Sequence, residues 1–149
     1  MLQSFLENET FRQLMHNHVQ ETLNLLFKEG INFSILANIA EVRFDPNLPE
    51  HISRNFKPIT MFFLAGYTFE SAHIKDNSLN FEAGFGQENI GSFVSVPLSA
   101  ILQVVVEETP VLINLAIPKE IEKADDRGVE KSMEALFSNP ENKKLFKKS

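Results

Sequence analysis

The spacing of apolar residues changes near Gly30, and this change constrains the fold more than any other feature of the chain. Before Gly30, apolar residues recur every three or four positions, which is the spacing of one face of an α-helix. Asn8 or Thr10 is suited to cap such a helix at its start, and Gly30 to end it in the left-handed conformation. We therefore expect a helix over residues 9–28.

After Gly30, apolar and polar residues alternate, which is the spacing of β-strands with one buried face. The clearest example is Leu79–Phe85, and a similar segment begins at Phe33. Ile59–Ala65 is a short apolar run that fits a buried strand. Prolines and turn residues separate these segments. One helix followed by several short strands predicts an α+β fold that is mainly β, with a largely antiparallel sheet or small barrel over about residues 31–117.

Three segments in this region allow less definite predictions. The stretch Tyr67–Lys75 has the pattern of a strand. Leu98–Val106 is apolar almost throughout, so its start fits a short helix while its end is compatible with helix or strand. Val111–Ile117 is expected to form the last strand.

Charge is distributed unevenly along the chain. Residues 1–118 hold 6 basic and 13 acidic side chains, a net charge of −7, whereas residues 139–149 have a net charge of +3. We therefore divide the chain into a domain over residues 1–118, a charged linker or helix over 119–138, and a hydrophobic–basic tail over 139–149.

Several classes of function are disfavoured by the sequence. The chain has no cysteine, which excludes a thiolate metal site, and His16 and His18 lie two apart on the expected helix and so point to different faces. We expect no metal and no cofactor. Gly84-Phe85-Gly86 lacks the pattern of a phosphate-binding loop, and no serine lies in a nucleophile turn. The protein is therefore not expected to be an enzyme.

Charge and hydropathy also limit the expected partners and location. An acidic body disfavours binding to nucleic acid, which requires clustered cations. No segment approaches the roughly 18 consecutive apolar residues of a membrane span, and the first residues are acidic rather than basic, which disfavours a secretory signal. We expect a cytoplasmic protein that binds or scaffolds other proteins.

Two neighbouring segments give a more specific prediction. Residues 79–86 read L-N-F-E-A-G-F-G, and residues 94–102 read V-S-V-P-L-S-A-I-L. Together they resemble the stringent starvation protein B family, in which a strand of the form F-x-A-R-F-G precedes a loop, a V-S-V-P-like strand end and a short apolar helix. The resemblance extends over about residues 9–117, and this chain has Gly84 where the family pattern has arginine.

The resemblance implies both a fold and a function. Members of that family have a small Sm-like barrel or sandwich behind an N-terminal helix, usually as a homodimer. They are adaptors that bind the ssrA degradation tag and deliver tagged proteins to the ClpXP protease. The alternative is a related peptide-binding or scaffolding domain with a different client and no role in proteolysis.

The resemblance also implies three sets of site residues. Peptide binding is expected at Phe81, Ala83, Phe85, Gly86, Val94, Val96 and Leu98, although alternation along the strands places about half of this set in the core. Docking on the ClpX unfoldase is expected at Lys143, Lys144, Leu145, Phe146, Lys147 and Lys148, a tail that would equally fit a merely solubilising role. The two-fold contact of the dimer is expected along the helix stripe, at Phe11, Leu14 and Met15.

Overall fold

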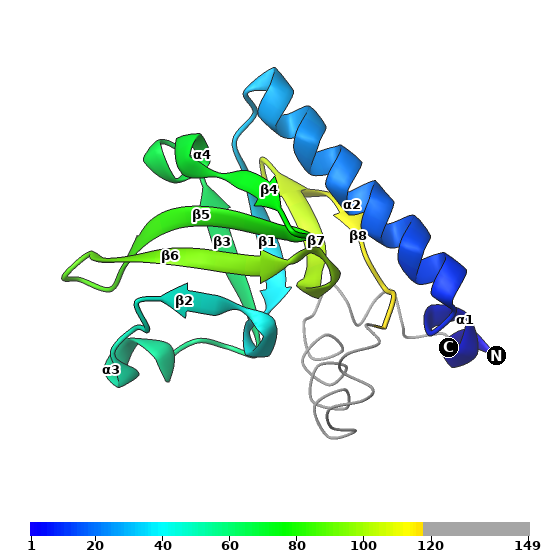
Figure 1. Ribbon diagram of the computed structural model, residues 1–149, viewed down its shortest axis with the longest axis horizontal. Coiled ribbons are helices and arrows are strands. Elements are labelled where there is room, and N and C mark those ends of the chain that lie inside the picture. The colour runs from blue at the N-terminus through cyan, green and yellow to red at the C-terminus, as the bar shows by residue number, and fades with distance from the viewer. Residues whose placement is uncertain (118–149) are drawn as a thin grey trace.

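The computed structural model describes residues 1–117, which form an α+β fold with helices at the N-terminus and two antiparallel sheets (Figure 1). Strands provide most of the regular structure after residue 30, as the alternating sequence predicts. The linker predicted over 119–138 and the tail predicted over 139–149 lie outside the described residues.

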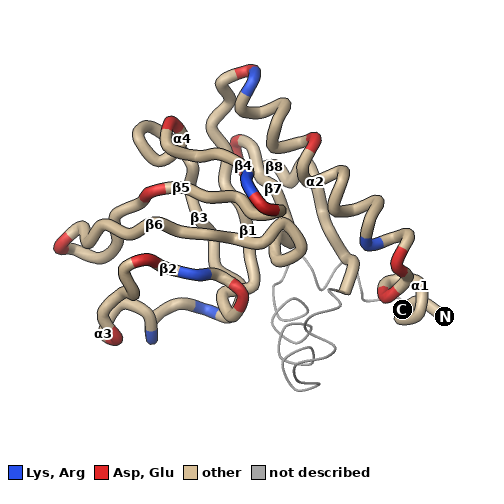
Figure 2. Tube along the Cα trace, viewed as in Figure 1, with Lys and Arg blue, Asp and Glu red and all other residues tan. Residues whose placement is uncertain are grey.

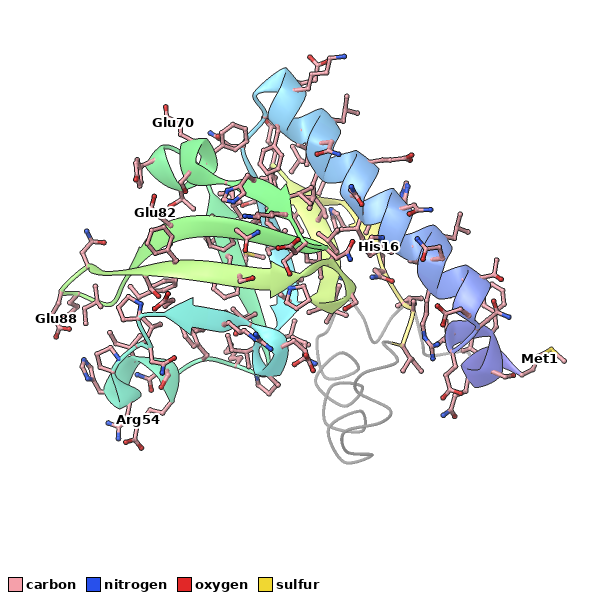
Figure 3. The ribbon with its side chains drawn as sticks, in the orientation of Figure 1. Met1, His16, Arg54, Glu70, Glu82 and Glu88 are labelled. Atoms are coloured by element: carbon pink, nitrogen blue, oxygen red, sulfur yellow. The ribbon has the colours of Figure 1, made fainter. Side chains whose placement is uncertain are left out.

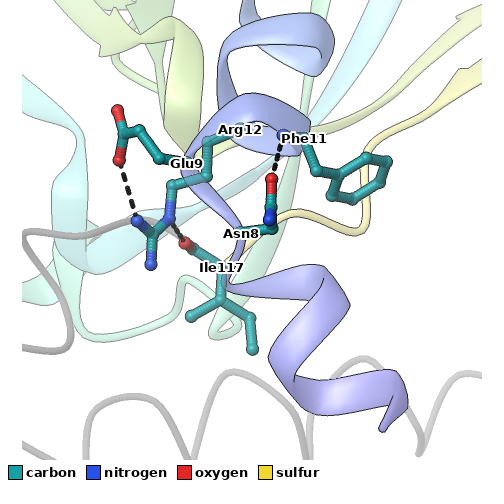
Figure 4. Close-up of polar contacts among 5 residues, drawn as sticks. All are labelled: Asn8, Glu9, Phe11, Arg12 and Ile117. Carbon is teal, nitrogen blue, oxygen red and sulfur yellow. Dashed lines mark hydrogen bonds and ion pairs between the residues drawn. The ribbon is translucent and has the colours of Figure 1, made fainter.

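The predicted N-terminal helix is confirmed. A short helix α1 (Leu2–Leu6) is followed by the long helix α2 (Glu9–Glu29). Asn8 is the N-cap of α2, and its side-chain oxygen accepts a hydrogen bond of 3.0 Å from the backbone N–H of Phe11 (Figure 4). Gly30 ends the helix with a φ of 67°, a conformation that costs glycine less than any residue with a Cβ.

The strands form two sheets of four. Sheet A has the order β3 (Ile59–Leu64), β1 (Phe33–Asn38), β7 (Ile101–Val106), β8 (Thr109–Ile113). Sheet B has the order β2 (Arg43–Asp45), β6 (Ile90–Pro97), β5 (Ser78–Phe85), β4 (His73–Lys75). Every neighbouring pair is antiparallel. In Figure 1 the strands of sheet B run across the view, and those of sheet A run steeply behind them.

Short helices connect the strands. They are η1 (Ile39–Glu41), α3 (Glu50–Ser53), α4 (Tyr67–Ser71) and η2 (Leu98–Ala100). The segment 67–75 is not one strand, as predicted, but α4 followed by β4. Segment 98–106 begins with the short helix η2, as expected, and its end, for which helix and strand were both open, is the strand β7. The last strand is β8, which covers Thr109–Ile113 rather than the predicted Val111–Ile117.

The helical turn of α4 has a packing reason that the alternating pattern does not reveal. It directs Phe69 toward the junction of α2 and β1, where its ring centroid lies 5.6 Å from that of Phe27 and 6.2 Å from that of Phe33. Phe27 and Phe33 contact each other as well, at 5.6 Å. These edge-on or tilted contacts are the arrangements that aromatic rings prefer, so tertiary packing determines the local structure here.

The core lies between the two sheets and is closed by α2. Phe62 of sheet A and Phe81 of sheet B are both buried, with ring centroids 5.9 Å apart. From α2, the buried side chains Val19, Leu23 and Leu26 join the same cluster. Burial of each large apolar side chain contributes roughly 1.5–3 kcal/mol, so this face of α2 holds the helix against the sheets.

The end of the described chain is attached to the N-terminal helices. The backbone N–H of Ile117 donates a hydrogen bond of 2.9 Å to the carbonyl oxygen of Leu6. Its carbonyl oxygen accepts a hydrogen bond from Nε of Arg12, whose guanidinium also lies 3.1 Å from a carboxylate oxygen of Glu9 (Figure 4). The two ends of the described domain are thus held together by polar contacts.

Candidate functional site

Four of the residues predicted to line a peptide groove belong to the core instead. Phe81, Val94, Val96 and Leu98 are each at most 2% exposed and pack in the cluster between the sheets. The reason is the pleat of the strands, which sends every second side chain to the same face. The apolar members of β5 and β6 face inward, so these four side chains pack in the core, although Phe81 and Val94 also border the larger hollow over sheet B described below.

The other three predicted residues lie toward the β5–β6 hairpin. Ala83 is half-buried, and Phe85 packs edge-on against Phe44 with ring centroids 5.5 Å apart. Gly86 is exposed and has a φ of 74° at the start of the turn, where its carbonyl oxygen accepts a 3.1 Å hydrogen bond from the backbone N–H of Asn89. Phe85 therefore contributes mainly to packing, and Gly86 to the shape of the turn.

The outward-facing residues of sheet B line two adjoining hollows. The larger, of about 790 Å³, lies over all four strands of the sheet, and the smaller, of about 420 Å³, lies between α4 and the hairpin. Both are lined by Tyr67, Glu82 and Phe93. We call the two together the sheet B hollow. Its lining mixes polar side chains with two exposed aromatic rings, which suits contact with a polypeptide.

One edge of β5 is free at this hollow. β4 pairs only with Ser78–Asn80, and beyond it the hydroxyl of Ser71 in α4 accepts a 2.9 Å hydrogen bond from the backbone N–H of Glu82. Beyond Glu82, no strand among residues 1–117 pairs with β5 on that side. Since the N–H and C=O groups of alternate residues point to the same edge, those of Gly84 share the direction of Glu82.

Acidic groups gather at the same place. The hydroxyl of Tyr67 donates a 2.8 Å hydrogen bond to Oε2 of Glu82. This bond is the largest cause that raises the pKa of Tyr67, and the charge of Glu82, a small loss of solvation and the charge of Glu70 act in the same direction. Figure 3 shows Glu70 and Glu82 on the same side of the molecule, beside α4. The α4 end of the hollow is therefore negative.

The side chain of Asn89, in the loop after β5, lies against Gly84. A Cβ on Gly84 would collide with the side-chain oxygen of Asn89. Asn89 is exposed, so this collision is relieved when its side chain turns away. A side chain at position 84 requires Asn89 to move.

The remaining predicted residues lie away from this hollow. Leu14 is 60% exposed on α2, Met15 is half-buried, and the ring of Phe11 lies 4.6 Å from that of Phe5 between centroids. Residues 143–148, predicted to dock on ClpX, lie outside the described part of the chain. Within residues 1–117, no group of three or more histidine or acidic residues is placed to hold a metal ion.

Sequence reasoning missed Tyr67, Glu82 and Phe93 as lining residues. The signal for Phe93 was available, because it lies out of phase with Val94 and Val96 of the same strand and must point to the opposite face. Tyr67 had no such signal, since its position depends on α4. The register places Phe93 directly opposite Glu82.

Comparisons with known proteins add no identification. Neither the models of protein families nor the curated proteins match this chain. Among residues 1–117, no helix has the length and apolar character needed to cross a membrane.

Proposed function

We propose that this chain is an adaptor that binds an extended peptide along the free edge of β5, in the sheet B hollow. The observation that carries this proposal is the free edge at Gly84, which adjoins a hollow with two exposed aromatic rings. An added strand would bond to the N–H and C=O of Gly84, and its alternate side chains would contact Tyr67 and Phe93. Main-chain bonds would provide affinity, and the hollow would provide selectivity.

The resemblance to the stringent starvation protein B family supports a specific client and pathway. In this proposal the peptide is an ssrA-type degradation tag, and the cytoplasmic adaptor delivers tagged proteins to ClpXP as a homodimer. Leu145 and Phe146 would anchor the tail on ClpX, while the flanking lysines would raise the encounter rate. A tethered docking segment acts by raising effective concentration, without a rigid geometry. The alternative is the same peptide site with a different client and no protease.

Alternate N-methylation of the peptide tests the strand-addition geometry. Only every second N–H of an added strand points toward β5, so methylating one alternate set should weaken binding at least tenfold, or about 1.4 kcal/mol, while methylating the other set should have little effect. The measurement is fluorescence anisotropy of labelled ssrA peptide with the full chain. Equal losses from both sets, or from neither, would contradict strand addition.

A bulky substitution locates the site. Thr68 lines the smaller hollow and is half-buried, so Thr68→Trp should fill it and reduce peptide affinity. Thr109 is exposed on the other sheet, so Thr109→Trp is the matched control and should leave affinity unchanged. Similar affinities for the two variants would exclude the sheet B hollow as the site.

Deletion of residues 140–149 separates delivery from binding. The truncated chain should bind the peptide as before but fail to stimulate degradation of a tagged reporter by ClpXP. Substituting Leu145 and Phe146 by serine, with all four lysines kept, should have nearly the same effect. Equal stimulation by the full and truncated chains would favour the alternative client.

A further inference from the structure

A row of side chains crosses the outer face of sheet B from β2 to β5. The register places Asp45 of β2 opposite Phe93 of β6, and Phe93 opposite Glu82 of β5. Residues directly opposite each other on neighbouring strands have Cβ atoms about 4.5–5.5 Å apart, so two acidic side chains flank Phe93. All three residues line the larger hollow. The phenylalanine ring is therefore an exposed apolar surface with an acidic residue on each side.

Tyr67 adds a second aromatic ring to this row. Its hydroxyl donates the 2.8 Å hydrogen bond to Oε2 of Glu82, and Tyr67 and Phe93 are 67% and 61% exposed. Tyr67, Glu82 and Phe93 line both hollows, so the Glu82 carboxylate has an aromatic side chain on either side. We call the set Asp45, Phe93, Glu82 and Tyr67 the aromatic–acid row.

The acidic groups of this row have no ion-pair partner within residues 1–117. Figure 2 shows acidic positions on β2, β5 and α4 around this part of sheet B. Among the described residues that line the smaller hollow, Glu82 is the only charged one. Arg43, the basic residue of β2, belongs to the next row, opposite Ser95. The raised pKa of Tyr67 has the same origin, because Glu82 and Glu70 make its surroundings negative.

We propose that the aromatic–acid row is a subsite for a cationic side chain of the bound peptide, and that arginine fits it best. This inference rests on the proposed peptide site and adds the class of side chain that the site selects. A cation is attracted by the face of an exposed aromatic ring as well as by a carboxylate, and this row offers both. A guanidinium is planar, stacks on rings and bonds to carboxylates through several N–H groups, whereas an ammonium is more strongly hydrated.

A strand added at Gly84 would bring its side chains to this row. The residue opposite Gly84 shares the outward direction of Glu82, because residues two apart on a strand face the same side. Glu82 is then its diagonal neighbour at about 7–8 Å, a distance that a long side chain spans and a short one does not. The apolar stem of an arginine would lie along the Tyr67 ring, while its guanidinium reaches Glu82 and Phe93. An acidic residue at the same position would be repelled.

The first test uses a single residue and does not depend on strand addition. Nα-acetyl-arginine amide and Nα-acetyl-citrulline amide have nearly the same shape, but only the arginine compound is charged. Tyr67 is the one tyrosine of the chain and there is no tryptophan, so tyrosine fluorescence reports binding at this row. The full chain should bind the arginine compound at least about fivefold more tightly, because the ion pair and the ring contact act together.

The second test compares ssrA peptides that contain arginine or citrulline at one position, moved in turn through the alternate set that faces outward. Fluorescence anisotropy should show at least about fivefold tighter binding of the arginine peptide at one of these positions. At 1 M salt, where the Debye length is about 3 Å, this preference should fall to about twofold or less.

Three variants assign the preference to named side chains. Glu82→Gln keeps an acceptor for Tyr67 but removes the charge, so it should abolish the preference for arginine over citrulline. Phe93→Leu removes the ring and keeps an apolar side chain, so it should reduce the preference to about twofold or less. Glu21→Gln is the matched control, because it makes the same charge change on the exposed surface of α2 and should leave the preference unchanged. Circular dichroism should show an unchanged fold for all three.

Two results would overturn the proposal: equal binding of the arginine and citrulline forms in both tests, or equal effects of Glu82→Gln and Glu21→Gln. Should Glu82→Gln not fold, Phe93→Leu decides, and an undiminished preference in that variant is equally contrary. The single-residue test separates this inference from the proposed function. If the arginine compound binds and no ssrA peptide does, the subsite stands and the client is wrong; if ssrA peptides bind without regard to arginine, the client stands and the subsite is wrong.

Discussion

Replacement of Phe81 by alanine tests whether this residue packs in the core, as the structure shows, or forms a wall of the peptide groove, as the sequence predicted. Phe81 is 2% exposed, and its ring packs edge-on against Phe62 at 5.9 Å. Truncation of a buried phenylalanine costs about 3–5 kcal/mol of unfolding free energy, part of which is the cavity that remains. The same change at an exposed site costs about 0.5 kcal/mol or less.

Urea denaturation followed by circular dichroism measures the difference. With a slope of about 2 kcal/mol/M, Phe81→Ala should lower the midpoint by about 2 M, while Phe93→Ala on the neighbouring strand should move it little. Below the transition, the Phe81 variant should still bind peptide. A midpoint change of less than about 0.5 M, together with lost peptide affinity, would refute the assignment of Phe81 to the core.

Two smaller perturbations test local features. Asn8→Ala removes the cap of α2 and should lower the free energy of unfolding by about 1 kcal/mol in the same denaturation assay, whereas Asn8→Asp, which keeps an acceptor, should lower it clearly less. Equal losses would show that the 3.0 Å bond from Phe11 does not stabilise the fold. Tyr67 is the chain's one tyrosine and there is no tryptophan, so absorbance at high pH reports Tyr67 alone. Its pKa should lie above the ordinary value of about 10, and Glu82→Ala should lower it, because this change removes both the hydrogen-bond acceptor and the charge that raise the pKa. An unchanged midpoint would contradict the bond to Glu82.

The sequence predicted the elements whose signals are local. The cap at Asn8, the stop at Gly30 and the alternation of Leu79–Phe85 all follow from neighbouring residues, and each occurs in the structure as expected. α4 was missed because the position of Phe69 is set by Phe27 and Phe33, which are distant in sequence. Local periodicity contains no information about such contacts.

The site was predicted less well, for a related reason. The motif directed attention to β5 and β6, whose outer face forms the candidate hollow. Most of the residues chosen as groove walls are apolar, and in a half-buried strand these are the residues that the core takes. Ala83 is the predicted residue that lines the smaller hollow. The hollow is lined mainly by the outward-facing residues that alternate with the core residues on the same strands, such as Asn80, Glu82 and Phe93. The alternation in the sequence shows which residues face outward. The free edge beside Gly84, in contrast, depends on where β4 ends.

The proposed homodimer and the proposed peptide site must not compete for the same surface. Sheets A and B lie back to back across one core, so their outer faces point in opposite directions. A dimer formed through any surface other than the outer face of sheet B would leave both sheet B hollows open to solvent. Each hollow could hold a peptide without competing with the contact between copies, and a client with two tags would bind with higher avidity than a client with one. A charge on the helix stripe predicted for the dimer, as in Leu14→Glu, should weaken that assembly without changing peptide affinity, whereas Thr68→Trp should weaken peptide binding and leave the dimer intact.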